Sequence, residues 1–283
     1  MQAQIHAPRV GYAYNLLDNS DFRNPVNQRG ASTYSGDFAY SIDRWQLGNG
    51  GAQISVISDG LKISNATGAG DYIFQRLERL PPGNYTFAAK FRDNTGAAAL
   101  TNYSTDQGVT LAPTSYADSG VLVLTFSNSE DLDSTFAYSR LQNTTPGAVC
   151  TWEWAALYEG EYTADTLPPY QPKGYAAELA ECKRYYELLD SGTSQFVRAY
   201  KDDVIAFCVD YYEKRAVPVI SMTGALGNAL NVAGVGAVTP TSIESAAPIG
   251  RKSARVNAMG SFDTSETYAI SYGIVRLSIS ADL

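Results

Sequence analysis

The segment Asn84-Tyr-Thr-Phe-Ala-Ala-Lys-Phe-Arg92 has the clearest strand pattern in the chain. Its large or apolar residues recur at every second position: Tyr85, Phe87, Ala89 and Phe91. Because successive side chains of a strand point to opposite faces, this alternation places them all on one face. Pro81-Pro-Gly83, directly before the segment, is a strong turn signal. The pattern predicts a half-buried β-strand that begins at a turn.

Short β-rich runs lie on both sides of this segment. These runs are Gln53–Ile57, Gly60–Ser64, Tyr72–Leu77, Gly120–Phe126 and Cys150–Tyr158. Ser58-Asp-Gly60 predicts a hairpin turn between the first two runs. Short strands at a spacing of roughly 8–12 residues are typical of a β-sandwich or jelly roll. We therefore predict a jelly roll over residues 15–164, preceded by an N-terminal arm of residues 1–14.

A linker and one helix follow the predicted jelly roll. The prolines of Leu167-Pro-Pro-Tyr-Gln-Pro-Lys-Gly174 favour an extended, semi-rigid spacer, and we assign residues 165–174 to it. An apolar stripe at helical period comes next: Leu179, Cys182, Tyr186 and Leu189. Ser191-Gly192 is the expected end of this helix. The helix could pair with copies of itself around a three-fold axis, but we favour packing on its own C-terminal sheet.

The rest of the chain returns to strand patterns. The predicted strands are Phe196–Tyr200, Val204–Tyr212, Val217–Met222 and one long strand, Tyr268–Ser280, in which Val275, Leu277 and Ile279 share a face. Small residues between 223 and 250 indicate loops. We assign residues 175–283 to the helix plus a C-terminal β-sandwich. The predicted fold class is all-β, with two β-sandwich or jelly-roll domains joined by a proline-rich linker and one short helix.

Composition and net charge argue against two classes of binding partner, nucleic acids and anionic membranes. The chain has 283 residues, of which 18% are charged and 20 are tyrosines, and its net charge is -8. A nucleic-acid partner or an anionic membrane surface requires a basic face, so we expect neither. The basic cluster Arg251, Lys252 and Arg255 is too short for a nucleic-acid arm. Apolar runs fall far short of the ~20 residues of a membrane span. Met1–Pro8 lacks the features of a signal peptide, so we expect synthesis in a cytoplasm.

The side chains that usually carry catalysis are scarce. The single histidine, His6, lies in the expected N-terminal arm, and no common hydrolase or nucleotide-binding motif occurs. A pair of carboxylates would suffice for glycan cleavage. Alternation places Glu153, Glu159 and Glu161 on the same strand face, where we expect a solvated or structural role. We expect no enzymatic activity.

Cysteine usage indicates no covalent framework. The three cysteines, Cys150, Cys182 and Cys208, are far apart and odd in number, and no C-x-x-C pair occurs. We expect buried, reduced thiols rather than disulfides or a zinc site.

Three segments resemble jelly-roll carbohydrate-binding modules. Asn15-Leu-Leu-Asp-Asn-Ser-Asp-Phe22 resembles the opening strand of such modules, and Pro82-Gly-Asn-Tyr-Thr-Phe87 resembles their central strand. Trp154-Ala-Ala-Leu-Tyr-Glu-Gly160, followed by Thr163, resembles their closing strand. The resemblance implies a jelly roll with glycan binding.

Other segments resemble phage and prophage tail proteins. Asn24–Gly30 and Tyr40–Trp45 resemble the tail-fibre version of the module. Ala177-Glu-Leu-Ala-Glu-Cys-Lys-Arg-Tyr-Tyr186 is similar to a Glu-Leu-Ala-x-Cys-x-Arg-Tyr-Tyr signature that follows such modules. Ser280-Ala-Asp-Leu283 fits how these proteins end. The resemblance implies a homotrimer in the virion that contacts other virion proteins and bacterial surface glycan. The chain has no long repetitive shaft, so a tip or adaptor is also possible.

The closing strand supplies the first candidate for a sugar site. Sugar sites combine an aromatic platform with polar side chains. If Ala155 and Leu157 face the core, as the resemblance suggests, Trp152, Trp154 and Tyr158 lie on the opposite face, which is either a binding groove or a surface packed under a loop or the second domain. Tyr103 and Tyr116, in polar loops, are further candidate contacts.

Two other groups have expected structural roles. The resemblance suggests that Trp45 begins a strand, and we expect it in the core. Asp18, Asp21 and Asp43 are candidates for a structural Ca²⁺ site, although no compact acidic loop is present. Apart from this ion we expect no cofactor.

The function predicted from sequence is therefore a phage tail or fibre adhesion protein that binds host surface glycan without cleaving it. Two alternatives stay open. One is a purely structural virion component, such as a tail, baseplate or capsid adaptor, without glycan binding. The other is a glycan depolymerase.

Overall fold

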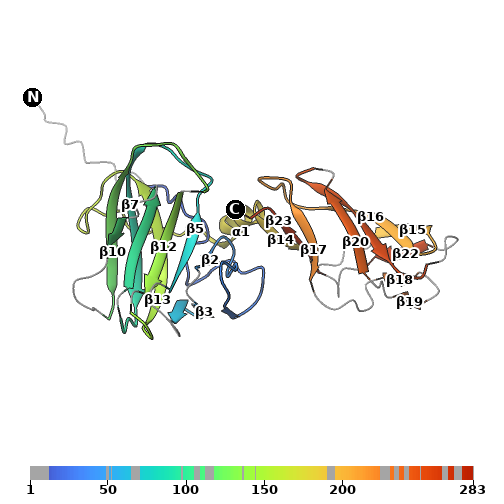
Figure 1. The fold of residues 1–283 in the computed structure, drawn as a ribbon, viewed down its shortest axis with the longest axis horizontal. Coiled ribbons are helices and arrows are strands. Elements are labelled where there is room, and N and C mark those ends of the chain that lie inside the picture. The colour runs from blue at the N-terminus through green and yellow to red at the C-terminus, as the bar shows by residue number, and fades with distance from the viewer. Residues whose placement is uncertain are drawn as a thin grey trace, which may run out of the picture. The chain divides into compact units, whose positions relative to one another are not determined.

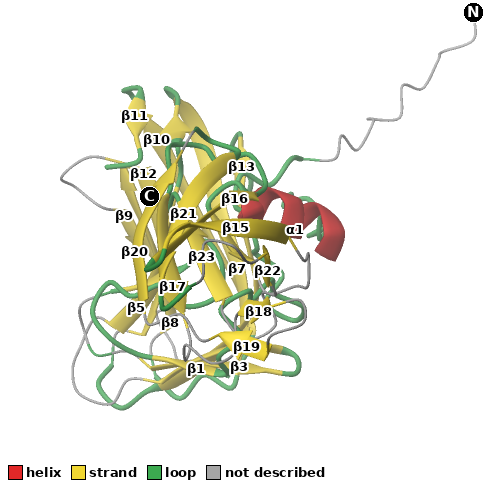
Figure 2. Ribbon diagram, turned by 90° about the vertical axis from the view of Figure 1, so that its right-hand side faces the viewer, coloured by secondary structure: helices red, strands yellow, loops and turns green. Residues whose placement is uncertain are grey.

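The computed structural model describes residues 13–48, 51, 53–64, 71–96, 98–104, 109–111, 118–135, 137–143, 145–189, 195–223, 230–232, 236–238, 242–248, 250–262, 267–270 and 276–282. The chain forms two compact units, Met1–Glu178 (unit 1) and Leu179–Leu283 (unit 2). The division falls inside helix α1, Tyr175–Lys183, rather than in the proline-rich segment. Nearly all other described elements are strands (Figures 1 and 2), so the fold class is all-β.

Unit 1 is a sandwich of two antiparallel sheets. The six-stranded sheet has the order β1 (Thr33–Tyr34), β3 (Gln53–Ile57), β4 (Gly60–Ser64), β13 (Val149–Glu159), β7 (Gly83–Arg92) and β10 (Gly120–Asn128). The five-stranded sheet has the order β2 (Gln46–Leu47), β5 (Asp71–Arg76), β12 (Ala137–Asn143), β8 (Ala98–Ser104) and β9 (Val109–Leu111). Strands β6 (Arg79–Leu80) and β11 (Leu132–Asp133) form a separate pair.

The core of unit 1 confirms the predicted alternation. Tyr85, Phe87, Ala89 and Phe91 of β7 are all buried between the sheets. Trp45 is also fully buried there, and its Nε1 donates to the carbonyl of Asn19 at 2.9 Å. The predicted hairpin is present, with Ile57 opposite Gly60. The period-two pattern was therefore a reliable guide wherever one face of a strand packs on the core.

The opening segment is fixed to the closing strand by one asparagine. Asn15 accepts from the N–H of Leu157 at 2.9 Å and donates to the carbonyl of Ala155 at 3.1 Å. The N–H of Leu16 also donates to the Leu157 carbonyl. The segment that resembles the start of a carbohydrate-binding module thus lies along β13, where its amide satisfies backbone groups of that strand.

Unit 2 also consists of two antiparallel sheets. The three-stranded sheet has the order β14 (Tyr186–Leu189), β23 (Arg276–Ser280) and β17 (Val219–Thr223). The seven-stranded sheet has the order β19 (Gly236–Val238), β18 (Leu230–Val232), β22 (Thr267–Ile270), β15 (Gln195–Lys201), β16 (Val204–Asp210), β21 (Ser253–Met259) and β20 (Ser242–Pro248). Buried residues of β16, β21 and β23 form one core, to which Ile205, Val256 and Ile279 contribute.

Two sequence predictions in this half are wrong. The helix ends at Lys183, and Tyr186 and Leu189 belong to β14. The carbonyl of Tyr185 accepts from Ala281 N–H at 2.6 Å, which turns the chain toward pairing with β23. The predicted long strand 268–280 is two strands, β22 and β23, which belong to different sheets. Leu277 and Ile279 do share a buried face, whereas Val275 lies outside the described residues.

The three cysteines are all free, and two of them are buried. Cys150 and Cys182 are free and buried as expected, but Cys208 is free and exposed. Its neighbours in β16, Phe207 and Val209, take the inward positions, so the alternation turns Cys208 outward. In the described part of the chain, no helix is long and apolar enough to cross a membrane.

Candidate functional site

The predicted aromatic face of the closing strand does not exist as expected. The register of β13 against β7 shifts between Trp152 and Trp154, so an extra residue, Glu153, interrupts the alternation. Trp152 is consequently fully buried in the core between the sheets, 5.9 Å from the ring of Phe91. The two tryptophans therefore lie on opposite faces, because a bulge reverses the side-chain direction on one side of it.

Trp154 and Tyr158 keep the expected face, but it is covered. The ring of Tyr170 stacks on Trp154 with centroids 4.7 Å apart and planes 4° apart. Tyr162 meets the ring of Tyr158 edge-on, and burial raises the pKa of Tyr158 to about 12. Leu167 also packs on this cluster. The segment 165–174 thus packs against unit 1 and is not a free spacer, and these rings are not open to a sugar.

The other two aromatic candidates, Tyr103 and Tyr116, are not part of the closing strand. Tyr103 lies in strand β8 and not in the expected polar loop; its backbone pairs with that of Tyr138, while its side chain lies outside the described part of the structure. Tyr116 lies outside the described residues altogether, as does His6.

The candidate calcium ligands are engaged by basic side chains instead. Asp18 accepts from Arg44 at 3.2 Å and from Lys173 at 3.0 Å. Asp21 pairs with Arg23 at 2.7 Å, and Asp43 pairs with Arg29 at 3.0 Å. Among the described residues, no three His, Cys, Asp or Glu side chains come together as a metal site. The structure therefore does not assemble Asp18, Asp21 and Asp43 around an ion.

The candidate glutamates of β13 and the loop after it do not form a pair suited to catalysis. Glu153, in the bulge, ion-pairs with Lys90 at 2.8 Å and lies 3.8 Å from Arg92. The bulge also removes the expected common face with Glu159, because it breaks the alternation of β13. Glu161 follows the strand in an exposed loop.

A different surface carries aromatic and polar groups together. It is the side of the five-stranded sheet that points away from the core, here called the outer face. Strand β5 presents Tyr72, Phe74 and Arg76 there, because Ile73 points into the core. Strand β12 presents Tyr138, Arg140 and Gln142 there, because Ala137 and Leu141 point into the core. Register aligns these residues in rows across the sheet, with Gln46 and Arg140 both opposite Phe74.

Guanidinium groups and rings alternate on the outer face. The Arg140 guanidinium lies 4.0 Å from the ring centroid of Tyr72 and 5.0 Å from that of Tyr138. The Arg76 guanidinium lies 5.4 Å from the centroids of both Phe74 and Tyr138. A cation placed over a ring within about 6 Å is attracted by the ring quadrupole. Each charged group therefore lies within reach of two aromatic rings.

The outer face is built in two levels. Tyr72 and Phe74 are buried, with exposed fractions of 8% and 2%, and form the lower level. Tyr138, Arg140 and Gln142 are half-buried and reach solvent above them. A side chain at Gly48 would meet the Tyr72 ring at 2.4 Å, so glycine is required at that point of the sheet edge. The lower rings fix the position of the upper polar groups.

The edge of this face carries an exposed aromatic residue in an unusual conformation. Phe38 is 52% exposed and has a φ of 54°, a left-handed value that bulky residues rarely adopt. Its N–H donates to the carbonyl of Gly48, and Gln46 Nε2 donates to the Phe38 carbonyl at 3.4 Å. Such strain occurs preferentially at functional sites. Phe38 therefore lies at the β2 edge of the sheet, bonded to Gln46 of the outer face.

Comparison with known proteins adds no family. No family model and no curated protein matches the sequence. Among solved structures, a proposed sugar-binding protein of Bacteroides thetaiotaomicron is 13% identical, with 52% of this chain and 100% of that chain covered and a TM-score of 0.35. The CBM22-1 and GH10 modules of endo-1,4-β-D-xylanase 10B from Clostridium thermocellum, in complex with xylohexaose, are 12% identical, with 53% and 29% covered and a TM-score of 0.32.

A third likeness spans both units. The CBM22-1–CBM22-2 tandem domain of Xyn10C from Paenibacillus barcinonensis is 10% identical, with 96% of this chain and 98% of that chain covered and a TM-score of 0.31. At these identities and TM-scores the likenesses carry no argument about what the chain binds. The functional argument therefore stands on the residues of the outer face.

Proposed function

We propose that unit 1 binds a glycan, without cleaving it, across the outer face. The observation that carries the proposal is the set of contacts in which Arg76 and Arg140 lie over Phe74, Tyr72 and Tyr138. Sugars present flat apolar C–H faces and many hydroxyls, so their sites combine aromatic rings with fixed polar groups. The outer face supplies both at one surface.

The chemistry of the upper level fits hydroxyl recognition. An arginine has five N–H donors in a planar group, and a glutamine amide both donates and accepts. Arg140 already donates to the Tyr138 hydroxyl at 3.0 Å, and Thr101 lies 3.2 Å from the Gln142 oxygen. These bonds fix the directions of the groups before a ligand arrives. Preorganised groups lose less entropy on binding.

The test is a glycan array with the full chain, followed by calorimetric titration of the best ligand. We expect Tyr138→Ala and Arg140→Gln each to raise Kd about ten-fold, as for loss of a stacking ring or a charged donor. The matched controls are Tyr200→Ala, an exposed tyrosine near Arg255 in unit 2, and Arg79→Gln, an exposed arginine of unit 1. Gln46→Ala is a milder variant that keeps the rings in place.

Two outcomes would overturn this proposal. One is a folded wild-type chain that binds no glycan of the array. The other is a set of outer-face variants that bind as well as the controls. In the same samples we expect no release of reducing ends from the bound polysaccharide, and steady release would favour a depolymerase.

We further propose that the chain acts in a phage virion as a tail or fibre adhesion protein, as a homotrimer attached to other virion proteins. The support is the resemblance of residues 24–30, 40–45 and 177–186 to phage and prophage tail proteins. Mass spectrometry of purified particles should detect the chain, and sedimentation equilibrium should give three times the chain mass of 30.5 kDa. Presence in particles without glycan binding would instead favour a purely structural component.

A further inference from the structure

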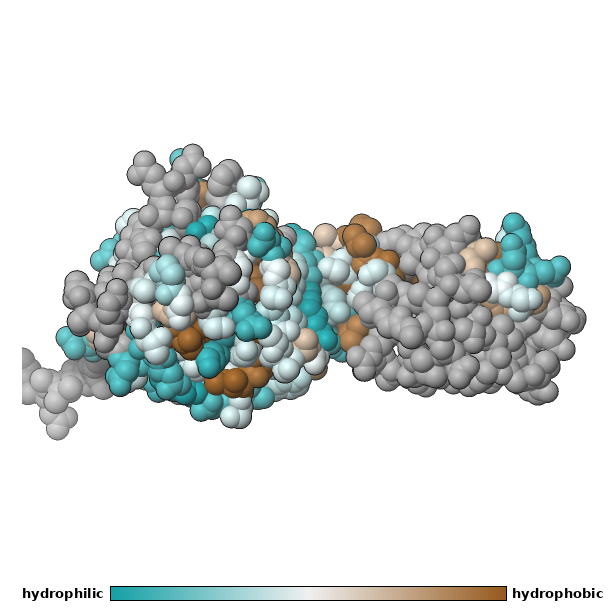
Figure 3. Space-filling model, turned by 60° about the horizontal axis from the view of Figure 1, so that its bottom comes forward, coloured by the Kyte–Doolittle hydropathy of each residue, from teal (hydrophilic) through white to brown (hydrophobic). Residues whose placement is uncertain are grey.

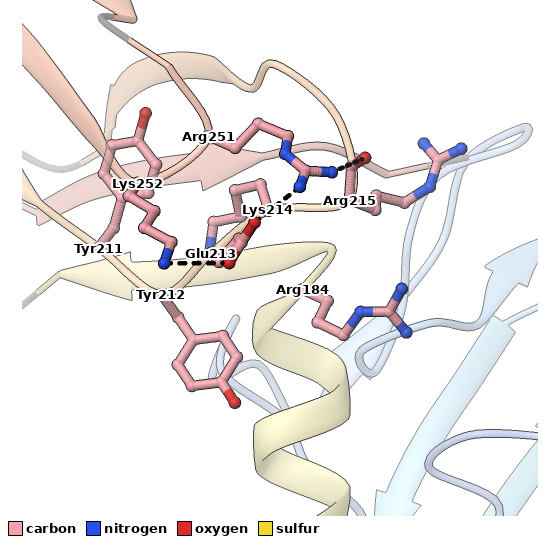
Figure 4. A pocket seen from close by; sticks show the side chains of 8 residues that line it. All are labelled: Arg184, Tyr211, Tyr212, Glu213, Lys214, Arg215, Arg251 and Lys252. Carbon is pink, nitrogen blue, oxygen red and sulfur yellow. Dashed lines mark hydrogen bonds and ion pairs between the residues drawn. The ribbon is translucent and has the colours of Figure 1, made fainter.

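Unit 2 contains a basic hollow that the proposed function does not use. Its volume is about 670 Å³, within the range of roughly 300–1,000 Å³ typical of ligand sites. Five cationic residues line it, together with Glu213 and two tyrosines, Tyr211 and Tyr212; the cationic residues are Arg184, Lys214, Arg215, Arg251 and Lys252. Figure 4 shows that these side chains come from three separate chain segments and that Arg251 and Lys252 both reach Glu213.

The positive charge exceeds the negative charge around this hollow. Glu213 is shared by Arg251 at 2.7 Å and Lys252 at 3.1 Å (Figure 4). Glu181 pairs with Arg184, and Glu187 pairs with Lys214. These three carboxylates and Asp282, which acts on Lys214, are four acidic groups against the five cations that line the hollow. In a chain of net charge -8 such an excess is a local feature.

The base of the hollow is held together by hydrogen bonds. Lys214 is fully buried, and its Nζ donates to the carbonyl of Lys183 at 2.6 Å and to Glu187 at 3.0 Å. Tyr211 donates to the carbonyls of Gly250 and Ser253. Burial would raise the pKa of Glu187, but the Lys214 charge and the Tyr212 N–H lower it overall, whereas burial lowers the pKa of Lys214. Buried groups that are fully bonded in this way hold the rim residues in place.

The rim is open to solvent. Arg251, Lys252 and Tyr212 have exposed fractions of 52%, 70% and 47%. The Arg251 guanidinium also donates to the Arg215 carbonyl at 3.3 Å, which fixes its plane. An exposed guanidinium of fixed orientation matches a carboxylate in a bidentate manner.

We propose that this hollow binds the carboxylate of an acidic saccharide. Arg251 and Lys252 contact the carboxylate, and Tyr212 contacts the adjoining sugar ring. The anion preference follows from the charges of the hollow, whereas the choice of a saccharide over another carboxylate rests on the proposed function. A nucleic acid fits poorly, because an extended phosphate backbone requires a basic face larger than this hollow.

The experiment is a calorimetric titration of the full chain with tetragalacturonate, its neutral methyl ester and inorganic phosphate. We expect binding of the acidic tetramer and at least ten-fold weaker binding of the ester and of phosphate. Arg251→Gln/Lys252→Gln should raise Kd about ten-fold or more, since two charged donors are lost. Glu213→Gln should lower Kd, because it releases both cations for the ligand. Arg79→Gln is the matched control and should leave Kd unchanged.

Each contrary outcome has a definite meaning. If the ester binds as tightly as tetragalacturonate, the proposed preference for an anion is wrong. If phosphate binds as tightly, the proposed choice of a saccharide ligand is wrong. Binding that is lost in Arg140→Gln but not in Arg251→Gln/Lys252→Gln overturns this site and leaves the outer-face proposal standing. If the wild type does not bind tetragalacturonate and the double variant no longer self-associates, the hollow is instead a contact between copies of the chain.

Discussion

The stacking of Tyr170 on Trp154 makes a quantitative prediction for unit 1. The variant Tyr170→Ala removes a ring that lies parallel to the indole at 4.7 Å. Such a pair contributes about 0.5–1.5 kcal/mol beyond burial, and burying a large apolar side chain contributes about 1.5–3 kcal/mol in full. Tyr170 is half-buried, so about half of the burial value applies. We expect the free energy of unfolding of unit 1 to fall by ~2 kcal/mol.

Urea unfolding followed by tryptophan fluorescence measures this directly. All three tryptophans, Trp45, Trp152 and Trp154, belong to unit 1, so the signal reports that unit alone. Trp154 is 8% exposed, and its emission should shift to longer wavelength in the folded variant as water reaches it. The control Tyr175→Ala removes an exposed ring, which should change stability by no more than about 0.5 kcal/mol. If Tyr170→Ala behaves like this control, the segment does not pack on unit 1 and is the spacer that the prolines suggested.

Four other predictions concern the cores, the buried ion pair and the thiols. Trp152→Ala should destabilise unit 1 by roughly 3–5 kcal/mol in the same assay, whereas an exposed platform residue would cost little. Lys214→Met should lower the stability of unit 2 by about 3 kcal/mol, because it removes the buried partner of Glu187 and leaves only the partly exposed Lys183, 3.3 Å away, to balance the carboxylate; calorimetry should show recovery when Glu187→Gln is added. Since the folded pKa of Glu187 is lowered, its contribution should be complete above the ordinary value near 4.5 and lost as pH falls through the folded pKa. In the native protein only Cys208 should react rapidly with a thiol reagent, because the other two thiols are buried.

The sequence predicted strand orientation correctly where a period-two pattern of apolar residues ran without interruption. In β7 every second residue is apolar, and the structure buries those residues as predicted. In β13 the same rule failed, because a bulge at Glu153 changes the register and nothing in a period-two pattern marks it. The helical stripe failed for a related reason. Tyr186 and Leu189 fit a helical pattern and a strand pattern equally well, and their pairing with β23 makes this segment a strand.

The sequence analysis did not predict the outer face, because strand β12 lacks a regular alternation of apolar and polar residues. In β12 two of the inward positions, Ser139 and Asn143, are polar. Ser139 donates to Asn102 at 3.1 Å, and Asn143 donates to the carbonyl of Ala148 at 3.1 Å. A polar residue is tolerated inside when it is hydrogen-bonded. The alternating Tyr138, Arg140 and Gln142 were the available signal, but alternation of apolar residues alone does not detect it.

Two sites in one chain make a prediction that neither makes by itself. If the outer face and the basic hollow bind the same polymer, occupation of one raises the effective concentration at the other, to the order of mM for short flexible tethers. Arg140→Gln and Arg251→Gln/Lys252→Gln should then each reduce affinity more for a long acidic polysaccharide than for a tetramer. Surface plasmon resonance on both immobilised ligands measures the difference. Equal losses on the two ligands would show that the sites act independently, because a single site gains nothing from polymer length.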